Sequence, residues 1–292
     1  MTLTASQLKL SYGSRDVVQV PSLQLERAST VCLIGPNGCG KSTLLRTLAG
    51  LRKPATGIVS LEGKPLTAWN PKALARRLAF LPQSPATPKG VSVRQLVAHG
   101  RYPHQGIFSR LSAYDHEVIS WSMNATGIGH LHDRDVASLS GGERQRAWIS
   151  MILVQESNII LLDEPTTYLD MGHQAELMEL LAKLQRQRQL TIVMALHDLN
   201  QACQYADRLL AMRDGQILAD GAPLDVVDSQ LSERLFGLVT QRIDRSLEGR
   251  LVPYCLPVGP LRPGHRAHEA MPAAPAVAQS KDLIHLAGFH HD

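Results

Sequence analysis

The sequence predicts an α/β fold with a mostly parallel sheet, an antiparallel β edge subdomain and an inserted α-helical subdomain. Two apolar runs of buried-strand type, 158–163 and 191–196, alternate with helix-forming runs, which is typical of a parallel sheet covered by helices. Residues 8–31 alternate apolar and polar positions around turn signals that include Pro21, which indicates antiparallel strands. Across residues 84–138 strand-like runs disappear and helical periodicity takes over, so we expect a helical subdomain there.

Length and composition are those of an ordinary globular chain. It has 292 residues, of which 44% are hydrophobic and 19% charged, and its formal net charge of +4 is too small to indicate nucleic-acid binding. No apolar run approaches the roughly 18 residues needed to cross a bilayer, and the polar N-terminus does not resemble a secretory signal. Any membrane association is therefore expected through a protein partner. Four cysteines without paired spacing suit a reducing compartment and argue against a structural zinc site.

A phosphate-binding loop connects an apolar run, 30–34, to a helix-forming run, 44–49. Residues 35–43 fit the pattern G-x-x-x-x-G-K-[ST] of P-loop NTPases, whose core is a RecA-like, mostly parallel sheet. Glycines let the backbone wrap around an anion, and the following helix presents free N–H groups to it. We expect Lys41 to reach the β- and γ-phosphates and Ser42 to ligate Mg²⁺. The predicted ATP-binding residues of the loop are Gly35, Pro36, Asn37, Gly38, Cys39, Gly40, Lys41, Ser42 and Thr43.

Cys39 lies in this loop, close to the start of the expected helix. A thiol at a helix N-terminus is expected to have a lowered pKa. We therefore predict that alkylating reagents inactivate the protein and that ATP protects it. The alternative is that Cys39 is a small filler without a function of its own.

Two acidic residues close the buried strand at 158–163. Asp163, at the carboxyl end of a strand, is suitably placed to hold Mg²⁺ beside a phosphate-binding loop. Glu164 adds a second carboxylate, which can polarise a water molecule for in-line attack on the γ-phosphate. The alternative is a solvated strand end without chemistry. With the loop upstream, the pattern predicts binding and hydrolysis of a nucleoside triphosphate.

The run Leu139-Ser140-Gly141-Gly142-Glu143 indicates one family. Five specified residues arise by chance in roughly one of 10⁴ chains of this size. The run resembles the signature motif of the ATP-binding-cassette ATPases, and the resemblance covers about residues 3–256. It implies further roles, with Tyr12 stacking on adenine, Gln83 as the Q-loop glutamine, Asp170 in the D-loop and His197 as the switch histidine.

In this family two cassettes pair head to tail, so the ATP bound by one chain would be closed over by the signature motif of a second copy. The resemblance implies Glu164, His197 and Gln83 as catalytic residues, and Ser42, Gln83 and Asp163 as metal ligands. His197 would contact the γ-phosphate and help to hold the water against Glu164. Gln83 would report the state of the metal to the helical subdomain.

Further segments resemble the ATPases of ferric-siderophore importers, such as those for ferric enterobactin and ferric citrate. These segments are residues 100–105, 166–170, 196–202 and 253–255. The resemblance implies an ATPase subunit at the cytoplasmic face of a bacterial inner membrane. Its helical subdomain would grip a cytoplasmic helix of integral-membrane permease subunits, and a periplasmic substrate-binding protein would act indirectly. Vitamin B12 and haem importers share much of the pattern and stay open as alternatives, and a plain surface loop is the alternative for 102–104.

A soluble ATPase that acts on ribosomes or DNA is another class with the same motifs. Such proteins normally carry two cassettes or a long coiled-coil insertion, and neither is visible in this sequence. We therefore expect no nucleic-acid partner.

The predicted organisation is an ATPase domain over residues 1–256, with the helical subdomain inserted at 84–138, followed by a tail over 257–292. The tail is rich in Pro, Ala and His, and we expect it to be flexible. Its histidines could sense a metal, but they lack an i,i+4 pair or a cysteine partner that would organise a site.

Overall fold

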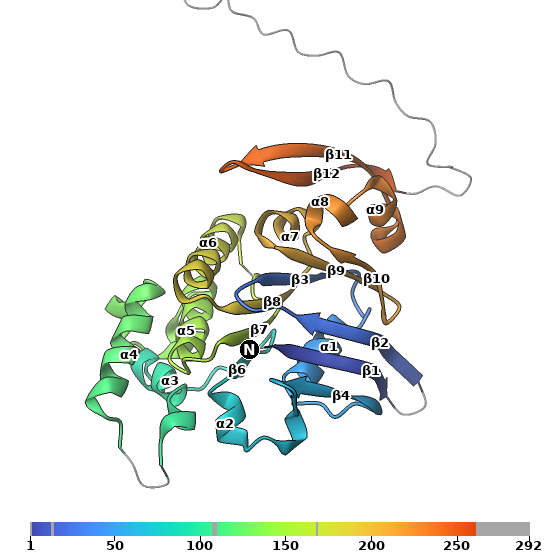
Figure 1. Ribbon diagram of the computed structural model, residues 1–292. Helices are drawn as coiled ribbons and strands as arrows, with labels where there is room; N and C mark the ends of the chain where they lie inside the picture. The colour runs from blue at the N-terminus through green and yellow to red at the C-terminus, as the bar shows by residue number, and fades with distance from the viewer. Residues whose placement is uncertain (1, 13–14, 107–109, 168, 261–292) are drawn as a thin grey trace, which may run out of the picture.

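The computed structural model describes residues 2–12, 15–106, 110–167 and 169–260 (Figure 1). It does not describe the side chains of Tyr12 and Arg15. The predicted flexible tail lies outside the described residues from position 261 onward, and with it the tail histidines His265, His268, His285, His290 and His291.

A six-stranded sheet forms the centre of the molecule, in the order β10-β9-β3-β8-β7-β6. The strands from β9 to β6 pair in parallel, and β10 is antiparallel to β9. Every residue of β3, β7 and β8 is buried, as expected for apolar strands covered on both faces. The strands are β3 (Thr30–Ile34), β6 (Leu78–Leu81), β7 (Ile159–Asp163), β8 (Thr191–Leu196), β9 (Arg208–Arg213) and β10 (Gln216–Gly221). The predicted mostly parallel sheet is confirmed.

A second sheet is antiparallel and has the order β2-β1-β4-β5. Its strands are β1 (Leu3–Tyr12), β2 (Arg15–Leu25), β4 (Thr56–Leu61) and β5 (Lys64–Pro65). This confirms the antiparallel edge. The turn expected at Pro21 was wrong, because Pro21 lies inside β2. β2 is the outermost strand of its sheet, where a residue without an N–H group is tolerated.

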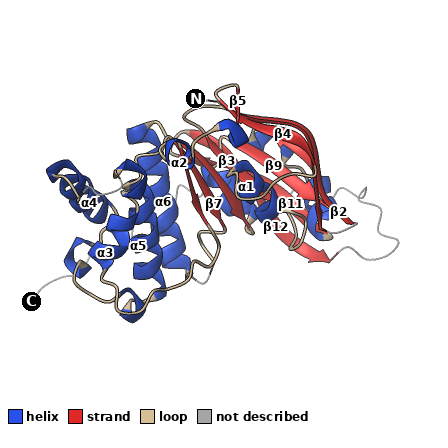
Figure 2. Cartoon of the chain, turned by 90° about the horizontal axis from the view of Figure 1, so that it is seen from below, coloured by secondary structure: helices blue, strands red, loops and turns tan. Residues whose placement is uncertain are grey.

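Alternate residues of the core strands pack into two hydrophobic clusters, one on each face of the sheet. In β3, Cys32 and Ile34 join the cluster that contains α5 and α6, whereas Val31 and Leu33 join the one that contains α1 and the antiparallel sheet. Figure 2 shows α3, α4, α5 and α6 gathered on one side of the molecule, with the strands on the other.

The helix-forming run predicted at 44–49 overlaps the first of the described helices. They are α1 (Lys41–Leu48), α2 (Pro71–Ala75), α3 (Val93–His99), α4 (Ala113–Ala125), α5 (Gly141–Leu153), α6 (Met171–Arg188), α7 (Leu199–Tyr205), α8 (Pro223–Val226) and α9 (Ser229–Phe236). Short 3₁₀ turns are η1 (Leu66–Ala68), η2 (Tyr102–His104), η3 (Gly129–Leu131) and η4 (Val136–Ser138). No helix within the described ranges is long and apolar enough to cross a membrane.

A buried arginine fastens the helical segment to the turn that precedes β7. Arg101 is only 2% exposed, and its Nε donates to Oδ1 of Asp115 at 2.6 Å. Its Nη1 donates to the carbonyl oxygen of Val154 and to Oε2 of Glu156, both at 2.6 Å. We call these four residues the Arg101 joint. Because a buried charge is costly unless it is paired, the joint holds α4 and the end of α5 in one arrangement.

Gly100 and Pro103, which flank Arg101 and Tyr102, are packed into the interior. A Cβ on Gly100 would lie 2.0 Å from the carbonyl oxygen of Met151, so only glycine fits there. Pro103 is buried, and its carbonyl accepts a hydrogen bond from Nε of Arg76 at 2.8 Å. Tyr102 is 64% exposed and is the residue of this turn most available to a partner.

The described chain ends in a hairpin of β11 (Leu238–Leu247) and β12 (Arg250–Pro260), which the sequence did not predict. Prolines in β12 weaken the strand signal, but both strands of a two-stranded sheet have an open edge, where proline is tolerated. β12 continues past Leu256, so the domain boundary expected between 256 and 257 falls inside a strand.

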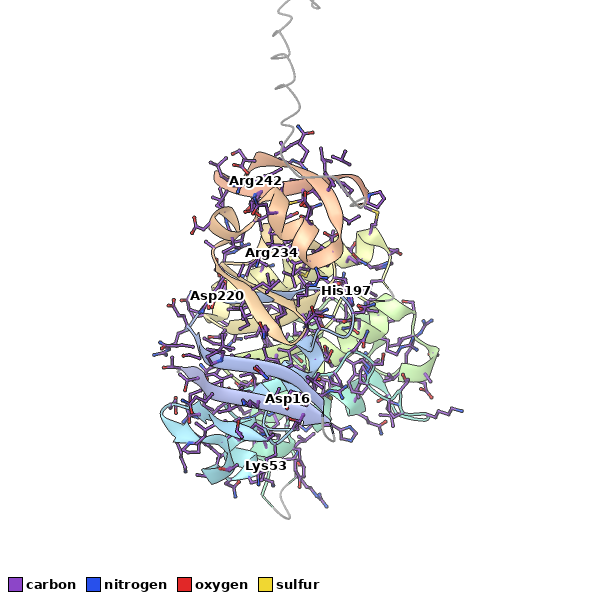
Figure 3. All side chains as sticks on the ribbon, turned by 90° about the vertical axis from the view of Figure 1, so that its right-hand side faces the viewer. Asp16, Lys53, His197, Asp220, Arg234 and Arg242 are labelled. Carbon is purple, nitrogen blue, oxygen red and sulfur yellow. The ribbon has the colours of Figure 1, made fainter. Side chains whose placement is uncertain are left out.

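Polar contacts made by Arg242 and Asn200 help to attach this hairpin to the core. Arg242, labelled in Figure 3, donates from Nη1 to the carbonyl oxygen of Val227 at 2.5 Å. Asn200 of α7 exchanges hydrogen bonds of 3.1 and 2.7 Å with the backbone carbonyl and amide of Cys255. Single-sequence patterns do not register such contacts between residues distant along the chain.

Candidate nucleotide-binding and catalytic site

The phosphate-binding loop runs from the end of β3 to the start of α1, as predicted. Two of its glycines are required by close packing and by their backbone conformation. A Cβ on Gly35 would lie 2.0 Å from the carbonyl oxygen of Met212, and one on Gly40 would lie 2.3 Å from Cγ2 of Val18. Their φ angles of 155° and 106° favour glycine as well. The loop is therefore held by β2 and β9 from outside.

Lys41 and Ser42 begin α1 at the mouth of this loop. Lys41 is buried, and its Nζ donates to the carbonyl oxygens of Gly35 at 2.7 Å and of Pro36 at 3.2 Å. The hydroxyl of Ser42 donates to Oδ1 of Asp163 at 2.7 Å. The first turn of α1 is thus tied to the end of β7, although the two lie far apart in the sequence.

Asp163 has one carboxylate oxygen in use and one free. Its Oδ2 is buried and has no hydrogen-bond partner among the described residues. Burial raises the pKa of this carboxyl, as does the neighbouring charge of Glu164, while the hydrogen bond from Ser42 opposes the shift. A buried, unpaired carboxylate oxygen next to a serine hydroxyl suits Mg²⁺, which prefers oxygen ligands. The residues present therefore fit the predicted metal.

Glu164 contacts the other two predicted catalytic residues, Gln83 and His197. Its Oε2 lies 2.6 Å from Nε2 of His197, accepts a hydrogen bond from Nε2 of Gln83, and accepts another from the Thr167 hydroxyl at 3.2 Å. The backbone φ of Glu164 is 52°, which is in the left-handed region, and the residue directly follows the end of β7. β6, β7 and β8 bring Gln83, Glu164 and His197 together because their carboxyl ends share one edge of the sheet (Figure 3 labels His197).

A cavity of about 360 Å³ opens over these groups. It contains nine of the predicted residues together with Val17, which the sequence analysis missed because β2 reaches the site only through the tertiary fold. The lining residues are Val17, Asn37, Gly38, Gly40, Lys41, Ser42, Thr43, Gln83, Glu164 and His197. The lining does not include Gly35, Pro36, Cys39 or Asp163, and the side chain of Tyr12 is outside the described part of the chain.

The lowered pKa predicted for Cys39 was wrong. Cys39 is buried, and burial raises the pKa of its thiol, although the charge of Lys41 acts in the opposite direction. Desolvation outweighs the helix N-terminus because the thiol faces the packed side of the loop. We therefore no longer expect rapid alkylation at neutral pH, and the filler role is favoured.

The signature residues Leu139, Ser140, Gly141, Gly142 and Glu143 are absent from the lining of this cavity. Ser140 caps α5 in a reciprocal arrangement with Glu143, which occupies the amides of these two residues. The amides of Gly141 and Gly142 have no intrahelical acceptor, because they belong to the first turn. Asp170 similarly caps α6 by accepting from the amide of His173 at 2.9 Å.

Comparison with known proteins identifies the family. Residues 18–167 match the ABC transporter family, just over half of the chain. The chain belongs to this family. It is 48% identical to the ferric enterobactin transport ATP-binding protein of Escherichia coli, over 89% of this chain and 96% of the relative.

Other similar proteins agree with this assignment. The petrobactin import ATP-binding protein of Bacillus anthracis is 47% identical, over 88% of this chain and 93% of the relative. A solved metal-chelate-type ABC transporter in an inward-facing conformation matches with a TM-score of 0.76 and 27% identity, over 88% of this chain and 97% of that chain. These comparisons confirm the family predicted from the signature motif. They also confirm the predicted resemblance to the ATPases of ferric-siderophore importers.

Proposed function

We propose that this ABC protein is the ATP-hydrolysing subunit that powers import of ferric-siderophore complexes through a membrane permease. The observation that carries the ATPase activity is the position of Glu164, which faces the phosphate-loop cavity with Gln83 and His197 on one of its oxygens. Similarity to transport ATP-binding proteins for ferric enterobactin and petrobactin supports the cargo.

In the proposed mechanism the backbone amides of the loop and Lys41 bind the phosphates of ATP, and Tyr12 stacks on adenine. Glu164 accepts the proton of the attacking water, since its carboxylate is the acidic group that faces the cavity beside the loop. His197 and Gln83 orient that carboxylate, because both contact Oε2. When the γ-phosphate is present, His197 is expected to contact it and to hold the water against Glu164.

Mg²⁺ would be held by Ser42, Asp163 and Gln83. It would neutralise the charge that develops on the phosphate oxygens during hydrolysis. The unpaired Oδ2 of Asp163 supports this assignment.

A second copy of the chain is the proposed partner for closing the site, in a head-to-tail dimer. The free amides of Gly141 and Gly142 at the start of α5 would bind the γ-phosphate held by the partner, and Asp170 would approach the same place. Their absence from the cavity of their own chain supports an action in trans. The dimer would sit at the cytoplasmic face of the membrane on permease subunits, and a periplasmic binding protein would deliver the cargo.

The test replaces the chain by its Glu164→Gln variant in cells, with Glu26→Gln as the matched control for loss of one carboxylate. We expect purified Glu164→Gln to hydrolyse ATP about 10²–10⁴-fold more slowly, as for loss of a general base. Ferric-siderophore uptake and growth under iron limitation should be lost, while vitamin B12 and haem uptake stay unchanged. Loss of B12 or haem uptake instead would move the cargo to that alternative. An ATPase with no transport phenotype would favour a soluble role.

A further inference from the structure

A histidine outside the predicted motifs connects the D-loop to the signature helix within one chain. Asp170 accepts the backbone amide of His173 on Oδ1 at 2.9 Å, and its Oδ2 lies 2.8 Å from Nδ1 of the same residue. Both bonds lower the pKa of Asp170, so its carboxylate is charged and accepts a hydrogen bond from Nδ1–H of His173. The imidazole is thus fixed on one edge.

The other edge of the imidazole lies against the first turn of α5. A Cβ on Gly142 would be 2.9 Å from Cδ2 of His173 and 3.4 Å from Nε2, so the ring packs directly on the glycine. Gly142 is buried by this contact, whereas the His173 side chain is 50% exposed. A larger residue at position 142 would push the ring away from Asp170.

A second contact, one turn further along both helices, fixes how α5 and α6 are aligned. Arg146 of α5 forms an ion pair with Glu176 of α6. The helices are therefore held together without His173, and what the imidazole adds is specific to their starting ends, where Asp170 and the two signature glycines lie.

We propose that His173 is a positioning residue for ATP hydrolysis in trans. Anchored on Asp170 and packed on Gly142, it holds the D-loop and the signature turn at a fixed separation, so that the chain offers them to the partner's nucleotide as one half-site. The proposal rests on the proposed function. It predicts that His173 affects the site that its own chain completes for the partner, and leaves its own phosphate loop unaffected.

The substitutions separate this role from helix capping. The Oδ1 bond to the amide of residue 173 needs only backbone, so it persists in His173→Ala. His173→Asn keeps a donor close to the position of Nδ1 but removes the part of the ring that covers Gly142. His132→Ala is the matched control, because His132 is 46% exposed and lies 2.9 Å from Asp133 in an equivalent surface pair.

The experiment uses full-length chains carrying Glu164→Gln, which slows hydrolysis so that captured ATP can be counted in mixed dimers. One partner carries Lys41→Ala, which disables its phosphate loop and leaves one working site. In the first mixed dimer, His173→Ala is on the chain with the intact loop. In the second, it is on the Lys41→Ala chain, whose signature turn completes the working site.

We expect the first dimer to capture ATP as the unmodified mixed dimer does. The second should need about tenfold more ATP, as for loss of one hydrogen bond to a charged group. His173→Asn should recover part of the difference, and His132→Ala should cause none. Equal capture by the two mixed dimers would overturn the positioning role while leaving the proposed function intact. Failure of the Glu164→Gln chain to capture ATP in any dimer would instead overturn the proposed function, and this inference with it.

Discussion

Two glutamates flank β7 and share an unusual backbone conformation, yet their side chains have different partners and different roles. Glu156 precedes the strand and Glu164 follows it, and each has a φ of 52°. Glu156 accepts from Arg101 at 2.6 Å and from the Tyr114 hydroxyl at 2.7 Å. Glu164 accepts from Gln83, Thr167 and His197 and faces a cavity. The first glutamate is committed to structure, whereas the second is left available for chemistry.

The surroundings of Glu156 and of the nucleotide-site carboxylates differ in the charged and polar groups that contact them. Burial would raise the pKa of Glu156, but the Tyr114 hydroxyl and the Arg101 guanidinium outweigh it and lower the pKa. In the nucleotide site, burial and a neighbouring carboxylate instead raise the pKa of Asp163. Carboxylates paired with a buried arginine stabilise the fold, whereas the unpaired Oδ2 of Asp163 is left available for a cation that arrives with the ligand.

The largest expected effect comes from removing the cation of the joint. Arg101→Ala leaves Asp115 and Glu156 without their charged partner, and we expect the free energy of unfolding to fall by about 3–5 kcal/mol. Denaturant unfolding of the purified variant measures this. Arg94→Ala, at an exposed position of α3, is the control and should be within about 0.5 kcal/mol of the parent. If Arg101→Ala lowered the free energy of unfolding by less than about 1 kcal/mol, the proposed contribution of the Arg101 joint to stability would be wrong.

A paired substitution compares the two glutamates directly. Glu156→Gln weakens two hydrogen bonds to a charged acceptor, so we expect a loss of about 1.5–3 kcal/mol in unfolding free energy. Glu164→Gln should be nearly neutral for stability while it abolishes most hydrolysis. Unfolding curves and ATPase rates on the same preparations give both readouts. Equal stability losses at the two positions would contradict the comparison.

The smallest effect is a pH dependence at the joint. Burial raises the pKa of Asp115, but bonds from Ser112 and Arg101 outweigh it and lower the pKa from 3.8 to about 2. A lowered folded pKa means that this stabilisation is complete above pH 4 and is lost as the pH falls toward 2. It amounts to up to about 2 kcal/mol. Asp115→Asn should flatten the unfolding free energy across that window, and the exposed Asp133→Asn should not.

Local patterns sufficed for much of the fold and the candidate site. The buried strands β7 and β8 were predicted at nearly their observed bounds, since continuous apolar runs carry their own signal. The resemblance to the ATP-binding-cassette ATPases implied Gln83, Glu164 and His197 as site residues, and all three line the cavity.

What the patterns missed depends on contacts between distant segments. Val17 reaches the cavity from β2, and the Arg101 joint unites residues from three separate segments of the chain, at positions 101, 115 and 154–156. Prolines in β12 weaken the strand signal of the hairpin β11–β12. The groups that attach the hairpin, Asn200 and the carbonyl oxygen of Val227, lie outside its own sequence. The pKa of Cys39 was mispredicted because burial, which is a tertiary property, outweighs the local helix terminus.

The placement of β7 between the Arg101 joint and the catalytic carboxylates has a mechanical consequence. The strand is five residues long, about 16 Å, and is hydrogen-bonded to parallel neighbours on both sides. Such a strand resists stretching and bending. A force applied to the helical segment at Arg101 is therefore transmitted along β7 to Asp163 and Glu164 with little loss of displacement. A displacement at the Arg101 end of β7 would therefore change the orientation of the Asp163 and Glu164 carboxylates at its other end.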